Sequence, residues 1–387
     1  MRITAIHTLC LSRLHEREQQ WATSVVRVIK ADAAIVVIET DEGLQGIAEA
    51  TPYGGPLLVR AEVARLAKAL VGKDPLSVIL EQSTFPGVAL GRFPHVRPIE
   101  AAVAGLDCAL WDLRGKIAGQ PVARMIAPSA PLKREVYAST GVRYDWRGDP
   151  GVLAAELAEA TALGYRHAKV RLGTDWAADG VTVERFLDRL GSAMACNSTL
   201  SVAVDGNCRL NLDQAQTMAR GLQELGCAWF EEPMPLDLAH YCELRRTSEI
   251  RISGGESLGT LIELAALVEG GAFDIVQPDV AVTGITTAIE IAAIAARHDV
   301  EVCPHSWHND LMTIANAHFM AGIGSMRPLE RCMVQGPLQS AVLAEPLPIA
   351  DGILSLCDAP GFGVSLGPDL EKRFPHIEGH YAIEVLR

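Results

Sequence analysis

Ionisable residues recur at nearly constant intervals through the second half of this 387-residue chain. The successive intervals are 26, 25, 23, 26 and 25 residues, and each residue closes a short apolar run rich in β-branched side chains. The six residues are Asp205, Glu231, Glu256, Asp279, His305 and Glu330. A strand with the helix and loops that follow it takes roughly 20–30 residues, so the intervals predict one functional side chain for each strand–helix unit. Parallel strands of a barrel end on one face, and we therefore expect these side chains to surround one pocket.

The first three members, Asp205, Glu231 and Glu256, offer only carboxylate oxygens. Such a set suits Mg²⁺, which prefers about six oxygen ligands and keeps positions open for water or substrate. Neither Cys nor His belongs to the set, which disfavours a softer metal. Acidic residues at strand ends can also cap the following helices, but three in register, with Asn207 and Glu232 at the same ends, favour a metal site.

Asp279 and His305 would lie at neighbouring strand ends. A carboxylate beside an imidazole orients the ring, selects its tautomer and stabilises the imidazolium, as a general base requires. A lone histidine is more often a satisfied buried residue, yet a position one unit beyond an aspartate and opposite a metal site favours catalysis. His308 is the weaker candidate, because we expect it on the loop beyond the strand.

Lys169 and Arg171 stand two residues apart on a predicted strand, so both side chains point to one face. At the barrel mouth they would put two positive charges beside the carboxylates and could bind an anionic substrate. The alternative is a pair of solvated basic residues at a strand end. For Glu330 we favour contact with a substrate carboxylate over a surface ion pair with Arg331.

The elements that must position these residues follow a strand–helix alternation from Val136 to about residue 332. Eight strands are predicted, near residues 136, 167, 200, 227, 251, 273, 300 and 326, which is the count of a parallel (β/α) barrel. The preceding segment of about 125 residues reads as α+β. The tail from Pro346 has no barrel unit left to form, so we expect it to fold back onto the N-terminal segment. The predicted domains are 1–125, 126–340 and 341–387.

Composition restricts the class of protein. The net charge of −13 argues against nucleic acid as a partner, although a bound divalent cation could still recruit an anionic substrate. Apolar stretches such as Ala288–Ala296 are shorter than the ~20 residues of a membrane span, and we recognise no signal peptide. Nine dispersed cysteines without a CxxC pair indicate reduced thiols, so we expect a cytoplasmic protein. The acidic surface is compatible with a symmetric assembly, and a homo-oligomer is expected.

Spacing, residue type and strand position together resemble the enolase superfamily, and within it the mandelate racemase-like subgroup. The resemblance covers essentially the whole chain. EGLQGIAEA and DCALWDLRGKIAGQPV are similar to the family's N-terminal capping domain, and DGILSLCDAPGFGVSL is similar to its closing segment. It implies an α/β, TIM-like barrel of the enolase type with an α+β capping domain that the C-terminal tail completes.

The resemblance also implies a role for each residue. Asp205, Glu231 and Glu256 would bind Mg²⁺, Asp279 and His305 would form the catalytic dyad, Glu330 would hydrogen-bond the substrate carboxylate, Asn207 would lie near metal and substrate, and Lys169 and Arg171 would occupy the family's Lys-x-Lys strand. The shared chemistry removes the proton α to a carboxylate. A divalent cation and preorganised donors stabilise the enediolate that results.

Arg171 departs from the racemase pattern, which has a second lysine base at this position. A guanidinium stays protonated at any usable pH, so Arg171 cannot remove a proton. His305 is then the expected base on one face, and abstraction there followed by loss of a β-hydroxyl is dehydration. We therefore predict an acid-sugar dehydratase that converts an aldonate or aldarate to a 2-keto-3-deoxy acid. By the family's usual geometry, the histidine face favours 2R substrates such as gluconate- or galactonate-like acids.

Two other functions stay open. The first is a sugar-acid lactone cycloisomerase, or a racemase or epimerase in which Lys169 is a second base. The second is a non-catalytic sugar-acid binding protein, which an intact set of six residues disfavours. Substrate specificity is expected to come from loops at 14–24 and 51–56, where Trp21, Tyr53 and the Gly54–Gly55 pair are candidate contacts.

Overall fold

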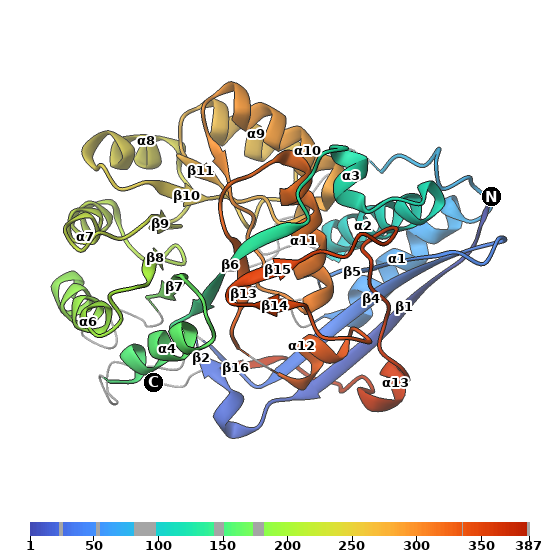
Figure 1. The fold of residues 1–387 in the computed structure, drawn as a ribbon, viewed down its shortest axis with the longest axis horizontal. Helices are drawn as coiled ribbons and strands as arrows, with labels where there is room; N and C mark the ends of the chain where they lie inside the picture. Colours follow the sequence, from blue (N-terminus) through green and yellow to red (C-terminus); the bar gives the residue numbers. More distant parts are fainter. Residues whose placement is uncertain are drawn as a thin grey trace.

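The computed structural model describes residues 1–22, 26–51, 55–80, 98–142, 151–172, 182–334 and 336–384. Two regions are distinguishable in the ribbon, an antiparallel sheet with its helices and a set of parallel strands surrounded by helices (Figure 1). Residues 1–126, from the N-terminus to the end of the third helix, are called the cap below.

The cap is built on a three-stranded antiparallel sheet of β1 (Ile3–Leu14), β4 (Lys30–Thr40) and β5 (Gln45–Glu49). A tight turn joins β4 to β5, and Gly43 supplies the positive φ of 81° that this turn needs. One face of the sheet is covered by helices, and β5 approaches them so closely that a Cβ at Gly46 would lie 2.2 Å from the Ala109 carbonyl oxygen. The helices of the cap are α1 (Pro56–Leu70), α2 (Pro98–Ala118) and α3 (Val122–Ile126).

The C-terminal tail returns to the cap. Strand β16 (Ala382–Glu384) pairs antiparallel with β3 (Val26–Val28), which in turn pairs with β2 (Trp21–Ala22) beyond the short 3-10 helix η1 (Arg17–Gln19). Earlier in the tail, the Ser12 backbone N–H donates to the Phe374 carbonyl at 3.2 Å. The N-terminal and C-terminal ends of the chain therefore share backbone hydrogen bonds.

Eight parallel strands follow in sequence, and each lies where the sequence predicts one. They are β6 (Lys133–Thr140), β7 (His167–Arg171), β8 (Ser201–Asp205), β9 (Phe230–Glu231), β10 (Ile252–Gly254), β11 (Ile275–Val276), β12 (Glu301–Val302) and β13 (Leu329–Cys332). Sequential neighbours pair from β6 to β12, and β13 pairs with β6. Across the remaining gap, no backbone ladder joins the described residues of β12 and β13. Ser325 Oγ instead donates to the Val302 carbonyl at 2.7 Å.

The helices between these strands begin at the caps that the sequence provides. Thr182 accepts a hydrogen bond from the Arg185 backbone N–H, and Asn211 with Gln214 forms a capping box. The helices are α4 (Gly151–Ala162), α6 (Val183–Ala195), α7 (Leu212–Glu224), α8 (Leu238–Thr247), α9 (Leu261–Glu269), α10 (Val280–Arg297), α11 (Asp310–Ile323), α12 (Pro337–Ala341) and α13 (Leu370–Arg373). A hairpin of β14 (Ile349–Ala350) and β15 (Ile353–Ser355) extends the sheet beside the start of β6.

Helix α10 joins the parallel strands to the cap. It is interrupted at Gly284, where φ is 74°, and the Asp107 carboxylate of α2 fills the interruption by accepting from the Thr286 backbone N–H at 2.9 Å and from its hydroxyl at 2.6 Å. A Cβ at Gly284 would lie 2.8 Å from Asp107 Oδ2, so glycine is required here. Within the described residues, α10 is also the one helix long and apolar enough to span a membrane, but 56% of that window is buried inside the protein, as in a core helix.

Candidate active site at the strand ends

The three predicted metal ligands stand at the carboxyl ends of consecutive strands. Asp205 and Glu231 are the last residues of β8 and β9, and Glu256 lies two residues beyond β10. Their side chains are 1%, 0% and 15% exposed, so the carboxylates are largely removed from water. Burial, together with repulsion among the carboxylates, raises the pKa of all three. A site that concentrates this much buried negative charge needs cations.

Lys169 supplies one of those cations. Its ammonium contacts the Glu231 carboxylate and lies 2.9 Å from Glu330 Oε1, and the three side chains are completely buried. Burial opposes the charge of Lys169, but Glu231 and Glu330 outweigh it and raise its pKa well above the usual value. Glu231 Oε2 also accepts from Trp229 Nε1 at 3.2 Å and from Gln277 Nε2 at 2.7 Å. No interval or motif in the sequence indicates the roles of Trp229 and Gln277 at this position.

Asn207 orients Asp205 from the same strand end. Its backbone N–H donates to Asp205 Oδ1 at 2.8 Å, and its side-chain amide donates to Oδ2 at 2.7 Å. Asn207, Cys208 and Glu232 all have positive φ, at 44°, 57° and 34°, a conformation that is costly for residues other than glycine. Glu232 is buried here too, and burial with repulsion from Glu256 and Asp205 raises its pKa well above the usual value.

The carboxylates fit a hard divalent cation by charge and by donor chemistry. The donors are all oxygens, and Glu256 Oε2 is buried without a hydrogen-bond partner. The oxygens of Asp205, Glu231 and Glu256 nevertheless lie farther apart than the ligand atoms of another group. Among the described residues, the one group whose ligand atoms all lie within 4.8 Å of one another is Asp279, His305 and His308. The assignment of Mg²⁺ to Asp205, Glu231 and Glu256 stays a prediction.

Asp279 and His305 are in contact. Asp279 is the N-cap of α10 after β11, and His305 lies in the segment after β12. His305 Nδ1 is 2.6 Å from Asp279 Oδ2, and His305 Nε2 is 3.6 Å from Glu256 Oε2. Burial alone would raise the pKa of Asp279, but His308 and the hydrogen bonds of both histidines lower it, so an ionised acceptor faces a donating Nδ1–H. Burial opposes the charge of His305, yet Glu256, Glu330 and Asp279 outweigh it and raise its pKa to about 10.

Glu330 lies inside β13 and is fully buried. Its Oε2 accepts from the Ser306 backbone N–H at 2.8 Å. Burial opposes its ionisation, but Lys169 and His305 outweigh burial and lower its pKa to about 2. The alternative of a surface ion pair with Arg331 is wrong, because Arg331 pairs with Asp310 at 3.6 Å. Contact of Glu330 with a substrate stays a prediction.

Arg171 lies among aromatic rings and carboxylates. Its guanidinium carbon is 3.9 Å from the centroid of Trp307 and 5.9 Å from that of Trp21, and its Nε is 3.7 Å from Asp205 Oδ2. Trp21 meets Trp307 edge to face at 5.7 Å. Trp21 comes from the cap and Trp307 from the segment after β12, so this contact joins the cap to the strand ends. Solvated basic residues, the alternative for Lys169 and Arg171, are excluded, since both are buried.

The structure thus brings most candidate residues together and adds others. Trp21 reaches the strand ends, whereas Tyr53 and Gly54 lie outside the described residues. His308 lies on the loop, as expected, yet its Nε2 is 2.6 Å from Asp279 Oδ2. Neither the contact of His308 nor that of Trp307 follows from the spacing of the strand ends. The sequence does contain one indication of these roles. In the segment PHSWHND, aromatic and polar residues follow His305 directly.

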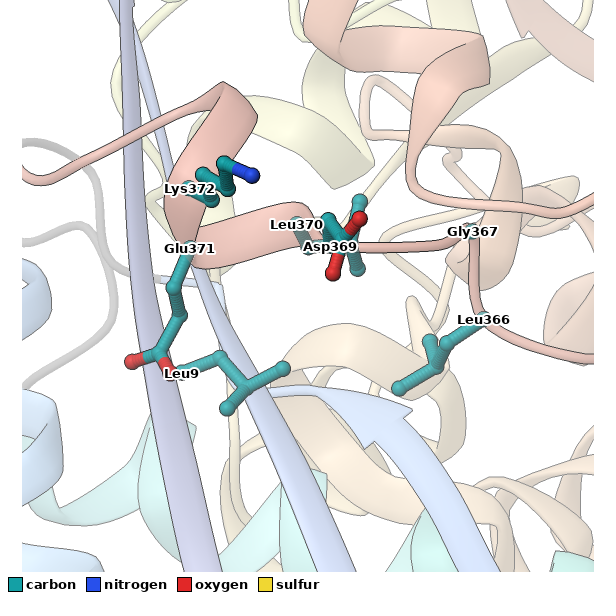
Figure 2. A pocket seen from close by; sticks show the side chains of 7 residues that line it. All are labelled: Leu9, Leu366, Gly367, Asp369, Leu370, Glu371 and Lys372. Atoms are coloured by element: carbon teal, nitrogen blue, oxygen red, sulfur yellow. The ribbon is translucent and has the colours of Figure 1, made fainter.

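A surface hollow of about 380 Å³ lies elsewhere, between β1 and the tail. Figure 2 shows its lining, in which Leu9 of β1 lies beside Glu371 of α13. None of the candidate site residues that the structure describes lines this hollow. The candidate metal ligands and the Asp279–His305 dyad lie instead at or just beyond the ends of the parallel strands.

Two family models match the chain. The model described as "Mandelate racemase / muconate lactonizing enzyme, N-terminal domain" matches residues 6–127, and "Enolase C-terminal domain-like" matches residues 152–370. Together they include residues 6–126 of the cap and every strand from β7 to β13.

Relatives also align with nearly the whole chain. A D-galactarolactone cycloisomerase of Agrobacterium fabrum is 27% identical, over 97% of this chain and 99% of its own. An arabinonate dehydratase of Saccharolobus solfataricus is 28% identical, over 93% and 95%. The crystal structure of a mandelate racemase/muconate lactonizing protein from Paracoccus denitrificans, complexed with magnesium, is 26% identical, with a TM-score of 0.83 and 99% coverage of both chains. The chain therefore belongs to the enolase superfamily and, within it, to the mandelate racemase-like subgroup.

Proposed function

We propose that this protein is a Mg²⁺-dependent acid-sugar dehydratase. It would convert an aldonate or aldarate to the corresponding 2-keto-3-deoxy acid. The observation that carries the proposal is the contact between His305 and Asp279, at 2.6 Å. Arg171 stays protonated and therefore cannot serve as a second base.

His305 is the proposed base. Asp279 holds the proton on Nδ1, so Nε2 is the atom that would take the α-proton of the substrate. Asp279 holds the His305 ring in one orientation, because the Asp279 carboxylate is itself fixed by the Ala281 backbone N–H at 2.9 Å and by Asn316 Nδ2 at 3.1 Å. A base that is already held in the reactive orientation loses little conformational entropy when the substrate binds.

Abstraction next to a carboxylate places a second negative charge on the same two oxygens. Mg²⁺, held by Asp205, Glu231 and Glu256, would supply the positive charge that lowers the energy of this state. Lys169 and Arg171 add fixed positive charge beside it. Trp307 stacks on Arg171 and holds its guanidinium in place.

Dehydration then balances without any further reactant. The C2–H bond breaks and its proton goes to His305, and the electron pair moves toward the carboxylate. When the pair returns, the C3–O bond breaks, and the hydroxyl leaves as water with a proton from His305 or another acid at the site. The enol product loses its O–H proton to water, gains a proton at C3 and becomes the 2-keto-3-deoxy acid.

A lactone cycloisomerase is the second candidate. It is favoured by one observation, the similarity to the D-galactarolactone cycloisomerase over 97% of this chain. It would use the same abstraction by His305, so the products must separate the two reactions.

A screen of aldonates, aldarates and sugar-acid lactones tests the proposal. The purified protein with Mg²⁺ is incubated with each compound, and 2-keto acid is detected as its semicarbazone. We expect one or a few 2R aldonates or aldarates to give 2-keto acid with the unmodified protein and none with the His305→Asn variant. Consumption of a lactone without keto acid would support the cycloisomerase, and equal turnover by the His305→Asn variant would exclude His305 as the base.

A further inference from the structure

Two histidines share one oxygen of Asp279. His305 Nδ1 and His308 Nε2 both lie 2.6 Å from Asp279 Oδ2. The other oxygen, Oδ1, accepts from the Ala281 backbone N–H and from Asn316 Nδ2. The Asp279 carboxylate thus lies against these four partners, and of them only His308 has no role in the mechanism above.

The three residues are joined by hydrogen bonds in this arrangement. Ligands of a single Zn²⁺ stand about 2.0–2.2 Å from the ion, so two of them are separated by roughly 3 Å or more. A separation of 2.6 Å between nitrogen and oxygen is instead the length of a charge-assisted hydrogen bond. His308 therefore acts on Asp279 as a second donor.

The cap reaches the other side of His308. Its Nδ1 is 3.4 Å from Thr51 Oγ1, just beyond the end of β5. Two residues earlier, the buried Glu49 carboxylate accepts from Asn309 Nδ2 at 3.1 Å. Thr51 and Glu49 come from the cap, whereas His308 and Asn309 follow β12. The contact of Thr51 with His308 therefore links the cap to Asp279 of the dyad.

We propose that His308 is a positioning residue that ties the cap to the catalytic dyad, holding the Asp279 carboxylate through Nε2 and meeting Thr51 through Nδ1. This inference rests on the proposed role of His305 as base. The residue acts through Asp279, and we assign it no contact with substrate.

The physical effect of His308 is to limit the motion of the carboxylate. With both donors in place, Oδ2 has one position that satisfies both imidazoles, and the His305 ring follows it. Without the second donor, a buried anionic oxygen loses half of its stabilising partners and the carboxylate gains room to rotate. A displacement of about 1 Å at a catalytic group can lower the rate on the order of 10²-fold.

A pair of variants at His308 tests the role of its donor. His308→Gln keeps an amide N–H at a position close to that of Nε2, whereas His308→Phe keeps a ring and removes every donor. With the acid sugar found in the screen, we expect His308→Phe to lower kcat on the order of 10²-fold with little change in KM. His308→Gln should restore most of kcat. The exposed His298, changed to Phe, is the matched control and should behave as the unmodified protein.

A second pair tests the cap side. Thr51→Ser keeps the hydroxyl and Thr51→Val keeps the shape without it. We expect Thr51→Val to lower kcat several-fold and Thr51→Ser to leave it near the original value. Equal effects of the two would indicate packing rather than the contact with His308.

A measurement without substrate separates this inference from the proposed function. In protein labelled with ¹⁵N-histidine, the His305 Nδ1–H proton should give a protected, downfield NMR signal in the unmodified protein and in His308→Gln. In His308→Phe the signal should broaden or exchange with water. An unchanged signal in His308→Phe, or an unchanged kcat, would overturn the inference. The expected NMR result without turnover of any acid sugar would leave the positioning role standing and count against the dehydratase.

Discussion

The ammonium of Lys169 lies 2.9 Å from the carboxylate of Glu330, and neither side chain is exposed to water. Lys169 contacts Glu231 as well, so one buried cation serves two buried anions from β9 and β13. Removing one partner of such a pair leaves a buried charge without compensation. The free-energy cost of that charge is much larger than the net stabilisation that the intact pair provides.

Replacing Lys169 with Met should therefore destabilise the protein by about 3–5 kcal/mol, measured by urea unfolding in the absence of metal. Changing Glu330 to Gln in the same chain should recover part of the loss, because one of the two unpaired anions is then neutral. The matched control is Lys68→Met, at an exposed position of α1. A loss at Lys169 no larger than at Lys68 would contradict the importance of the buried pair.

The positions of the strands and of most site residues could be predicted from the sequence, because interval and residue type repeat along it. All eight strands, the contact of Asp279 with His305 and the burial of Lys169 and Arg171 are present. What the pattern could not indicate are contacts between residues that no interval relates. Gln277 reaches Glu231 across strands, and Trp21 meets Trp307 from a different part of the chain.

His308 shows the same limit within a short segment. It lies on a loop, as the sequence predicts, but a loop position does not exclude a role at the site. The loop turns back so that His308 Nε2 meets the aspartate that His305 also uses. Only the path of the backbone, which a one-dimensional pattern does not contain, brings the two imidazoles to one oxygen.

Trp307→Leu should weaken substrate binding more than it slows chemistry. Arg171 would lose the ring face on which its guanidinium rests at 3.9 Å, an interaction worth about 0.5–2 kcal/mol. We expect KM to rise by roughly 3- to 30-fold with a smaller change in kcat. Trp307→Phe, which keeps an aromatic face, should recover most of the affinity. A fall in kcat alone would indicate that Trp307 acts on the base rather than on Arg171.

Removal of Mg²⁺ should abolish turnover and change the titration of His305. Without a cation, Glu256, Glu330 and Asp279 overcome burial and raise the His305 pKa to about 10, which keeps the ring protonated at neutral pH. Binding of Mg²⁺ among the carboxylates should lower the pKa of His305, because it offsets their negative charge. A base must be neutral, so in the Mg²⁺-loaded protein we expect activity above the lowered pKa of His305 and loss of activity as the pH falls through that pKa. Histidine NMR with EDTA and then with Mg²⁺ should show this decrease in pKa, and an unchanged pKa would contradict the metal assignment.

His318 offers a test of stability against pH. It is buried between α3 and the tail, where Nδ1 accepts from the Ala123 backbone N–H at 3.2 Å and Nε2 lies 3.1 Å from the Phe362 carbonyl. Burial lowers its pKa from 6.5 to about 4. The unfolded chain therefore takes up a proton near pH 6.5 that the folded chain refuses until about pH 4, so stability falls as the pH decreases through this window.

The size of that effect is about 3 kcal/mol between pH 7 and pH 4. Urea unfolding of the unmodified protein and of His318→Gln, at a series of pH values, isolates it from other groups. We expect the two stability curves to converge as the pH is lowered. Parallel curves would show that His318 can be protonated in the folded protein.

The most direct test of the central claim, abstraction by His305 on one face followed by loss of the β-hydroxyl, is a single ¹H NMR experiment in D₂O. An acid sugar from the screen is incubated with the protein and Mg²⁺, and substrate and product are followed together. We predict a 2-keto-3-deoxy acid with deuterium at C3, and remaining substrate of unchanged configuration at C2. Exchange of the C2 proton with inversion and without keto acid would contradict the account, since it requires a second base on the opposite face.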